Sequence, residues 1–251
     1  MRLLEEGAWW NAGMRDIASS LLDTVDLPER GMLLDIGCGS GQTMAWFGSN
    51  HPKWEVSGVD ISPDAVAAAR KAGLPVVTGS ATSLPFSDCS ADLVITFDVV
   101  QHLPFPDGDT LAFAEMKRVL RPGGYLLVRT NSQSYPRTVD DPANLFRKYE
   151  PGVLEARIRS AGLETIFLSR ANALLGLAEI PRELRATRRE GSGYHGILAV
   201  APGRGGTVDS LKRSILAAEG KMIAAGARLP FGRSILALCR RPAENASNST
   251  Q

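Results

Sequence analysis

Residues 33–42, LLDIGCGSGQ, decide the fold, because an apolar run ends there in three glycines spaced two apart. Leu33, Leu34 and Ile36 are typical of the end of a buried strand, and glycine at every second position prevents the strand from continuing. Glycine has no Cβ and accepts positive φ angles, so another group can lie directly on this backbone. The stretch therefore predicts a strand, a tight turn and a helix whose first N–H groups face a ligand.

Apolar runs alternate with helical patterns along most of the chain. Strands are expected at 32–37, 54–60, 75–78, 91–97, 124–130, 163–170 and 234–239, and helices at 8–25, 41–49, 63–72, 108–119, 150–161 and 207–226. Ser62 and Pro63 are an N-cap and a first helical residue, and the RPGG sequence at 121–124 separates a helix from the strand that follows. This alternation predicts a parallel sheet covered by helices on both faces.

The composition excludes several classes of protein. The 251 residues are 44% hydrophobic and carry a formal net charge of +1, which argues against global disorder and against a nucleic-acid or anionic membrane partner. The three cysteines lie far apart, so neither a disulfide framework nor a metal site is expected. No stretch has the length of apolar sequence that a membrane span needs. We therefore expect a cytoplasmic protein without a membrane span.

An acidic residue at the end of the second expected strand suggests what the turn binds. Asp60 ends that strand, where a carboxylate accepts hydrogen bonds from both hydroxyls of a ribose. The same residue serves NAD in dinucleotide-binding proteins, but their GxGxxG pattern places the third glycine one position later than Gly41. Asp60 alone therefore does not identify the nucleoside cofactor, but the early third glycine disfavours a dinucleotide.

The spacing Asp35-x-Gly37-x-Gly39-x-Gly41 resembles motif I of the class I S-adenosylmethionine (SAM) dependent methyltransferases. The stretches GSATSLPFSD (79–88), ADLVITFDVVQHLP (91–104) and RVLRPGGYLLV (118–128) are similar, in order and spacing, to later motifs of the UbiE-like, methyltransferase type 11 group. With EEGAWWNAGMRD near the start and LPFGRSILALCRRP near the end, the similarity covers most of the chain. It implies a Rossmann-like, seven-stranded and mostly parallel sheet with an antiparallel last strand, a helical N-terminal cap and an insertion before the last strand.

The resemblance also implies a domain organisation. We expect one methyltransferase domain over 1–251, with its core at 30–170 and 231–241. Segments 1–29 and 171–230 lie outside the repeating core and are expected to build the acceptor pocket. The polar tail, 242–251, is expected to be disordered.

The resemblance implies which residues bind SAM and its product S-adenosylhomocysteine. They occupy the glycine turn and the ends of three strands: Asp35, Gly37, Cys38, Gly39, Gly41, Asp60, Ile61, Ser80, Ala81 and Phe97. The family usually has an acidic residue where this chain has Ser80, so the hydroxyl, the backbone and Ile61 are expected to hold the adenine. No metal is required.

His102 is the candidate catalytic residue, because it follows the fourth strand and titrates near physiological pH. It acts as a general base or only orders its loop, and Asp98 orients it or lies in a solvated turn. The predicted reaction is in-line methyl transfer to an oxygen, nitrogen or carbon atom of a small molecule. Three alternatives remain: a SAM-fold enzyme with other chemistry, a non-catalytic SAM-binding subunit, and a dinucleotide oxidoreductase, which the glycine spacing disfavours. Neither the acceptor nor the oligomeric state is indicated.

Overall fold

The computed structural model describes residues 8–132, 147–175 and 207–243. These residues form two compact units. The sheet unit comprises the described residues of 27–131, 146–168 and 235–251, and the helical unit comprises those of 1–26, 132–145 and 169–234. Residues 244–251 of the expected disordered tail and residues 176–206, about half of the predicted insertion, lie outside the described residues.

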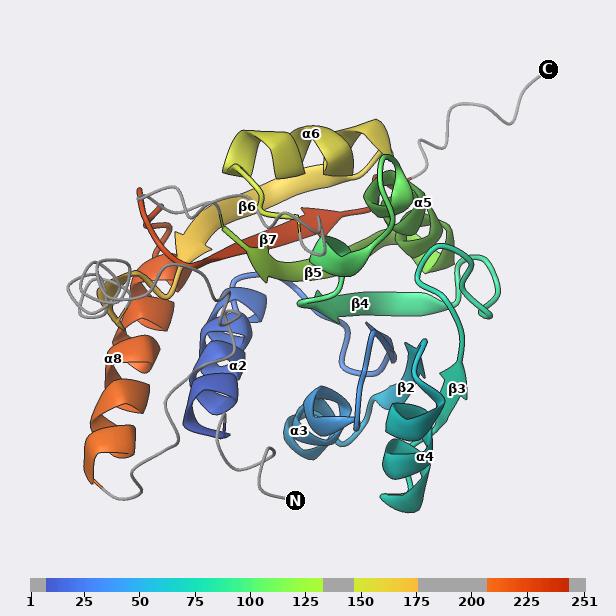
Figure 1. Ribbon diagram of the computed structural model, residues 1–251, viewed down its shortest axis with the longest axis horizontal. Helices are drawn as coiled ribbons and strands as arrows, with labels where there is room; N and C mark the ends of the chain where they lie inside the picture. Colours follow the sequence, from blue (N-terminus) through green and yellow to red (C-terminus); the bar gives the residue numbers. More distant parts are fainter. Residues whose placement is uncertain (1–7, 133–146, 176–206, 244–251) are drawn as a thin grey trace, which may run out of the picture. The chain divides into compact units, whose positions relative to one another are not determined.

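The order of the elements agrees with the alternation in the sequence (Figure 1). The strands are β1 (Met32–Ile36), β2 (Glu55–Asp60), β3 (Val76–Thr78), β4 (Ala91–Phe97), β5 (Leu120–Asn131), β6 (Glu164–Ala171) and β7 (Ser234–Arg240). The helices are α2 (Ala8–Leu22), α3 (Gln42–Asn50), α4 (Pro63–Lys71), α5 (Gly108–Val119), α6 (Pro151–Ser160) and α8 (Thr207–Ala224), with a short 3-10 helix, η1 (Val100–His102). All seven predicted strands are confirmed.

The strands form one seven-stranded sheet in the order β3-β2-β1-β4-β5-β7-β6. β1 runs parallel to β2 and β4, β2 to β3, and β4 to β5. β7 runs opposite to its neighbours (Figure 1), and the N–H of Gly123 donates to the carbonyl of Arg241 at 2.9 Å while the N–H of Ser132 donates to Arg233 at 3.0 Å. The Rossmann-like sheet with an antiparallel last strand is confirmed.

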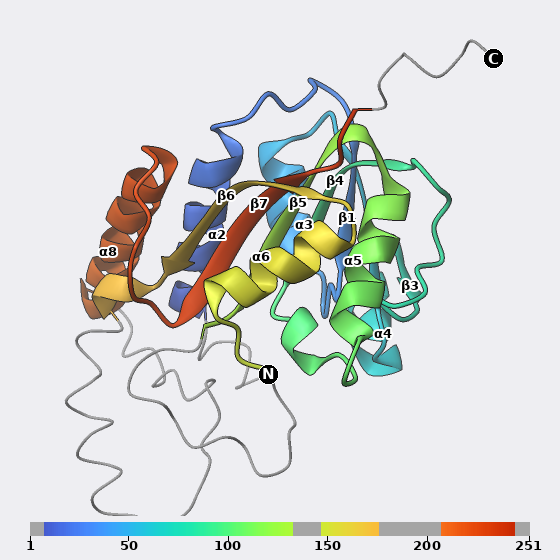
Figure 2. The ribbon, with the colours of Figure 1, turned by 90° about the horizontal axis from the view of Figure 1, so that it is seen from above.

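Helices cover both faces of the sheet unit. α3 and α4 lie on one face, and α5 and α6 lie on the other (Figures 1 and 2). The larger core packs Phe113 and Met116 of α5 and Leu154 of α6 against the sheet, and a smaller core contains Met44 of α3 and Val66 of α4. Because both faces are covered, the edge where parallel strands end in loops is left for a ligand.

Local signals set most element boundaries. The Ser62 hydroxyl accepts a hydrogen bond from the N–H of Ala65 at 3.3 Å and Pro63 opens α4, as expected. The prediction that a strand begins at residue 124 is wrong. β5 begins at Leu120, which pairs with Ala91 before a register shift in the ladder, so residues 121–124 belong to an irregular strand.

In the helical unit, α2 and α8 lie side by side (Figure 1). Glycines let the two helices approach closely. A Cβ on Gly13 would lie 2.4 Å from Cδ1 of Leu216, and a Cβ on Gly220 would lie 3.1 Å from Cα of Ile17. Larger residues at these two positions would therefore prevent α2 and α8 from packing as closely as they do. Among the described helices, none is both long enough and apolar enough to cross a membrane.

Candidate functional site

The glycine turn joins β1 to α3 in a left-handed backbone conformation. The φ angles of Gly37, Gly39 and Gly41 are +77°, +55° and +83°. The N–H groups of Gly37 and Cys38 donate to the carbonyl of Val59 at 2.7 and 3.1 Å, so the turn is tied to the end of β2. These angles are costly for residues with a Cβ, which explains the repeated glycine.

The three glycines differ in what surrounds them. A Cβ on Gly37 would lie 2.1 Å from Cγ2 of Val99, and a Cβ on Gly41 would lie 2.2 Å from Cδ1 of Leu74. A Cβ on Gly39 would meet no atom within 4 Å. Gly37 and Gly41 are therefore needed for packing within the protein, and Gly39 presents bare backbone to open space.

Asp60 lies against this bare backbone. One oxygen of its carboxylate accepts from the N–H of Gly39 at 2.8 Å, and the other accepts from the N–H of Ser62 at 2.9 Å. A carboxylate has about four lone-pair positions, so Asp60 keeps acceptor capacity for hydroxyl groups of a ligand. The neighbouring Ile61 is 75% exposed and offers an apolar surface beside that carboxylate.

Asp35 lies within β1, one residue before its end, and is 2% exposed. Its Oδ2 atom is buried without a hydrogen-bond partner. Burial, followed by the negative charge of Asp60, raises the pKa of Asp35 to about 7, against the opposing effect of Arg129. A buried carboxyl group with an unused oxygen attracts a cationic group or a hydrogen-bond donor.

Cys38 takes part in the turn through its backbone. Burial, followed by the charges of Asp35 and Asp60, raises the pKa of its thiol to about 12. Its side chain packs in the smaller core with Met44 and Val66. The thiol is therefore protonated and unreactive at physiological pH.

Ser80 and Ala81 follow β3, in the loop of residues 79–88. The Ser80 hydroxyl shares a hydrogen bond of 2.8 Å with the Thr82 hydroxyl and accepts one from the Thr82 N–H at 3.2 Å. Ala81 contributes its side chain to the larger core. The Ser80 side chain thus stabilises its own turn, and the N–H of Gly79 links the loop to the carbonyl of Asp60 at 3.0 Å.

Phe97 and His102 lie at the end of β4 and on η1. Asp98, between them, has a φ of +59° and forms an ion pair with Arg129 of β5, whose guanidinium carbon lies 4.7 Å from the centre of the Phe97 ring. Partial burial lowers the pKa of His102, although Asp98 opposes this effect. The imidazole is therefore mostly neutral at physiological pH, the form that accepts a proton.

A buried polar cluster beneath η1 was not predicted from the sequence. Arg147 forms a 2.5 Å ion pair with Asp109, and the Tyr149 hydroxyl donates to the same carboxylate at 2.9 Å. The guanidinium of Arg147 also donates to the carbonyl of Pro104 at 2.6 Å, and its backbone N–H donates to the carbonyl of Gln101 at 2.8 Å. The only signal in the sequence is an arginine two residues before a tyrosine, too common to indicate a partner 40 residues away.

The structure thus brings most of the predicted residues to one edge of the sheet. The glycine turn and Ser80 follow β1 and β3, and Asp60 and Phe97 are the last residues of β2 and β4. These four strands are parallel. Within the described ranges, no group of three or more His, Cys, Asp or Glu residues is placed to hold a metal ion. The arrangement offers bare backbone, two carboxyl groups and a neutral imidazole, which suit a polar, partly cationic small molecule.

Comparisons with known proteins relate part of the chain to a family and most of it to a fold. Residues 34–128 match the model of a family described as "methyltransferase domain". The chain is 35% identical over 146 residues to trans-aconitate 2-methyltransferase of Azoarcus sp. (strain BH72), covering 57% of this chain and 54% of the relative. It is 35% identical over 99 residues to fatty-acid O-methyltransferase of Mycolicibacterium smegmatis (38% of this chain, 35% of the relative). A third relative, the tRNA (carboxymethyluridine(34)-5-O)-methyltransferase of Arabidopsis thaliana, is 32% identical over 102 residues (41% and 24%).

The chain spans about half the length of the first of these relatives and less of the other two. Among solved structures, a putative sarcosine dimethylglycine methyltransferase from Galdieria sulphuraria matches with a TM-score of 0.58 and 18% identity, over 91% of this chain and 86% of that one. The [4+2]-cyclase SpnF matches with a TM-score of 0.58 and 22% identity, over 91% and 81%. At these identities the structures establish the fold alone.

Proposed function

We propose, on the premise that residues 34–128 form a domain of the class I SAM-dependent methyltransferase family, that this chain transfers the methyl group of SAM to a small-molecule nucleophile. The observation that carries the proposal is the open space over Gly39 beside the Asp60 carboxylate. A nucleoside with an amino-acid tail fits this pair, because the tail lies on bare backbone while the ribose hydroxyls donate to the carboxylate. The unused oxygen of Asp35 fits a cationic amino group.

We assign roles to the residues at the ends of β1, β2, β3 and β4 in turn. The backbone of Gly37, Cys38, Gly39 and Gly41 holds the amino-acid end, together with Asp35. Asp60 holds the ribose, Ile61 and the backbone at Ser80 and Ala81 hold the adenine, and the carbonyl of Phe97 faces the methionine end. SAM, when bound, supplies a methyl group on a positively charged sulfur. The protein therefore has mainly to align the acceptor and exclude water.

His102 is the proposed general base. A hydroxyl or protonated acceptor must lose a proton as its oxygen or nitrogen bonds to the methyl group, and a neutral imidazole accepts it. The lowered pKa of His102 keeps that form populated at neutral pH. For a carboxylate acceptor no base is needed, and the segment that carries His102 would then serve only to orient the acceptor.

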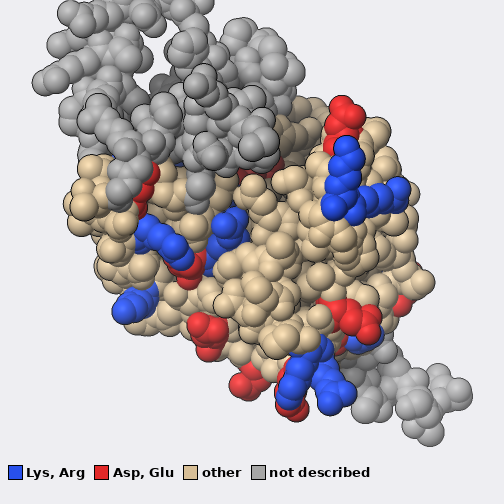
Figure 3. Space-filling model, turned by 90° about the horizontal axis from the view of Figure 1, so that it is seen from below, with Lys and Arg blue, Asp and Glu red and all other residues tan. Residues whose placement is uncertain are grey.

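A small molecule is favoured over nucleic acid as the acceptor. The net charge is +1, and on the face in Figure 3 the described acidic and basic side chains are interspersed. A nucleic-acid surface is usually a basic stripe. Two relatives are named for methylating trans-aconitate and fatty acids, so small carboxylic acids are the first acceptors to test. We also propose a cytoplasmic location, since the three cysteines are free.

The test begins with calorimetric titration of SAM, S-adenosylhomocysteine and NAD. We expect binding of the first two only, and Asp60→Asn should weaken it by about tenfold or more. Asp64→Asn, four residues along on α4, is the matched control and should bind as the wild type. Carboxylic acids, amines and a tRNA pool are then screened with a labelled methyl donor.

The outcomes separate the alternatives. Labelled small-molecule product with release of S-adenosylhomocysteine supports the proposal. Label found only in tRNA would overturn the small-molecule acceptor. Binding of SAM with no methyl transfer to any acceptor would favour the other SAM-fold chemistry or a binding subunit, and binding of NAD alone would refute the cofactor.

A further inference from the structure

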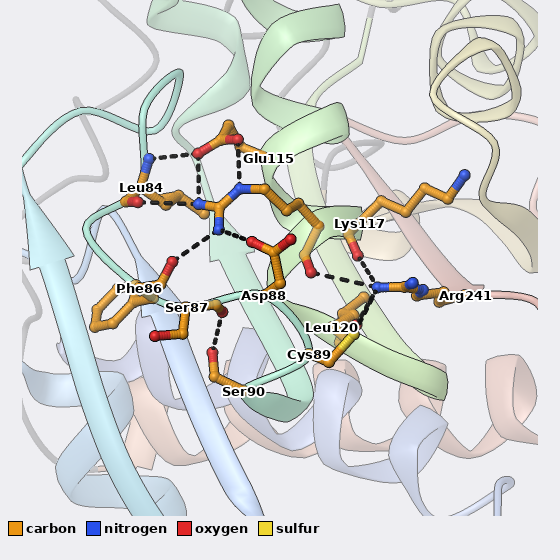
Figure 4. A network of polar contacts seen from close by, with 11 residues as sticks. Leu84, Phe86, Ser87, Asp88, Cys89, Ser90, Glu115, Lys117, Leu120 and Arg241 are labelled. Carbon is orange, nitrogen blue, oxygen red and sulfur yellow. Dashed lines mark hydrogen bonds and ion pairs between the residues drawn. The ribbon is translucent and has the colours of Figure 1, made fainter.

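Two side chains of α5 hold the second half of the loop of residues 79–88 (Figure 4). Glu115 accepts a hydrogen bond from the N–H of Leu84 at 2.7 Å, and Arg118 donates to the carbonyl of the same residue at 3.0 Å. Arg118 also donates to the carbonyl of Phe86 at 2.8 Å and to the carboxylate of Asp88 at 2.7 Å. The loop backbone is therefore fixed by side chains at a point where no strand ladder holds it.

Glu115 and Arg118 are held together by two parallel hydrogen bonds. Nε of Arg118 donates to Oε1 of Glu115 at 2.7 Å, and Nη2 donates to Oε2 at 2.8 Å. The guanidinium lowers the pKa of Glu115, which is therefore ionised at neutral pH. A planar guanidinium can serve two carboxylates and two carbonyls at once, which a lysine ammonium cannot.

Glu115 and Arg118 together form a clamp on Leu84, and this clamp also restricts the backbone of the first half of the loop. At one end of the loop, the N–H of Gly79 donates to the carbonyl of Asp60 at 3.0 Å. At the other, Leu84 is held by the clamp and is 6% exposed, in the same core as Ala81. Residues 80 and 81 lie between these two anchors, so a shift of Leu84 is transmitted to them.

We propose that Glu115 and Arg118 are positioning residues for the adenine end of the cofactor, an inference that rests on the proposed function. They act through the loop backbone and do not touch the ligand. They compensate for the neutral Ser80, whose hydroxyl is engaged by Thr82, by keeping the backbone that faces the adenine in place. Their effect belongs to cofactor affinity and not to methyl transfer, because His102 lies on a different segment.

The test compares two ligands that share the adenine end. S-Adenosylhomocysteine and 5′-methylthioadenosine both carry adenine and ribose, but only the first has the amino-acid end. We expect Arg118→Lys to raise the Kd of both by the same factor, about three- to tenfold, and to leave kcat at saturating SAM within about twofold. Arg121→Lys is the matched control. Arg121 lies at the start of β5 and forms an ion pair with Asp92 of β4, so its substitution disturbs an ion pair without touching the loop.

Thermal unfolding of each variant distinguishes positioning from stability. A lowered Tm with unchanged Kd for both ligands would overturn the inference, as would a loss confined to S-adenosylhomocysteine or a fall in kcat alone. If Arg118→Lys does not fold, the milder Glu115→Gln decides, because its amide oxygen keeps an acceptor for Leu84 and for one nitrogen of Arg118, whereas its NH2 group cannot accept from Nε of Arg118. Failure of the wild type to bind either ligand would refute the proposed function and not this inference alone.

Discussion

Asp35 is a buried carboxyl group whose pKa, raised to about 7, differs greatly from its usual value of 3.8. Between these values the folded protein keeps a proton that the unfolded chain has lost, so folding stability falls as the pH rises from about 4 to 7. Asp35→Asn removes this dependence and keeps the shape of the side chain. Without ligand, we expect the variant to gain about 1–4 kcal/mol over the wild type between pH 4 and 8.

Urea unfolding at pH 4, 6 and 8 measures this difference. Comparing the two proteins at each pH cancels the other titrating groups, such as Asp109, whose pKa is lowered because hydrogen bonds from Arg147 and Tyr149 outweigh its burial. The same variant should bind S-adenosylhomocysteine more weakly, since it lacks a charge for the amino group. A constant stability difference across pH would show that Asp35 ionises normally.

Two of the turn glycines, Gly39 and Gly41, should respond differently to alanine. Gly39→Ala places a methyl group in open space, so we expect a loss of about 1 kcal/mol in stability from the left-handed φ but a cofactor Kd raised about tenfold or more. Gly41→Ala meets Leu74 at 2.2 Å, so it should cost about 2–4 kcal/mol in stability. Unfolding curves and titrations of both variants check this. Equal cofactor binding by Gly39→Ala and the wild type would mean that no ligand lies on that backbone.

At the scale of elements, glycine, proline and serine made the boundaries predictable. Strand β4 and helix α5 were predicted to the residue, because polar residues, Ser90 and Asp98, flank the apolar run of β4, and Pro106 and Gly108 mark the start of α5. β5 was not, since its first residues pair through an irregular register that depends on the partner strand. Local sequence fixes where a chain must turn, but strand pairing depends on residues far away.

The candidate site also contains features that could be predicted from the sequence and features that could not. The glycine turn directly follows β1 and Asp60 ends β2, so their meeting could be predicted from the topology of a parallel sheet. The ion pair of Arg147 with Asp109 and the clamp of Arg118 on Leu84 join residues more than 30 positions apart. Neither has a periodic pattern, and the engagement of the Ser80 hydroxyl by Thr82 depends on the exact shape of one turn.

The buried cluster beneath η1 should dominate the stability of its segment. Asp109→Asn leaves Arg147 buried without a counter-charge and should cost about 3–5 kcal/mol, whereas Tyr149→Phe removes one hydrogen bond and should cost about 1 kcal/mol. Arg159→Ala, in an exposed pair with Glu155, is the control and should change stability by less than about 0.5 kcal/mol. Urea unfolding monitors all three. Equal losses for Asp109→Asn and Arg159→Ala would contradict a structural role for the buried pair.

At the scale of the whole molecule, every proposed cofactor residue belongs to the sheet unit. S-Adenosylhomocysteine at 100 times its Kd stabilises the native state by about 2.7 kcal/mol, which slows exchange through ligand-free open states by about 100-fold. We therefore expect hydrogen exchange to slow at residues 37–41, 60–62 and 79–84. Peptides from α2 and α8, in the helical unit, should be unaffected by this ligand.

Hydrogen exchange with a bound acceptor tests the role of the helical unit. If segments 1–29 and 171–230 build the acceptor pocket, as the sequence predicts, adding an acceptor or an unreactive analogue with S-adenosylhomocysteine should slow exchange in α2 or α8 as well. The Asp60→Asn variant is the control, since it should lose the protection caused by the cofactor. Protection of α2 and α8 by S-adenosylhomocysteine alone would assign these helices to the cofactor instead. Protection confined to the sheet unit with both ligands bound would remove them from the acceptor site.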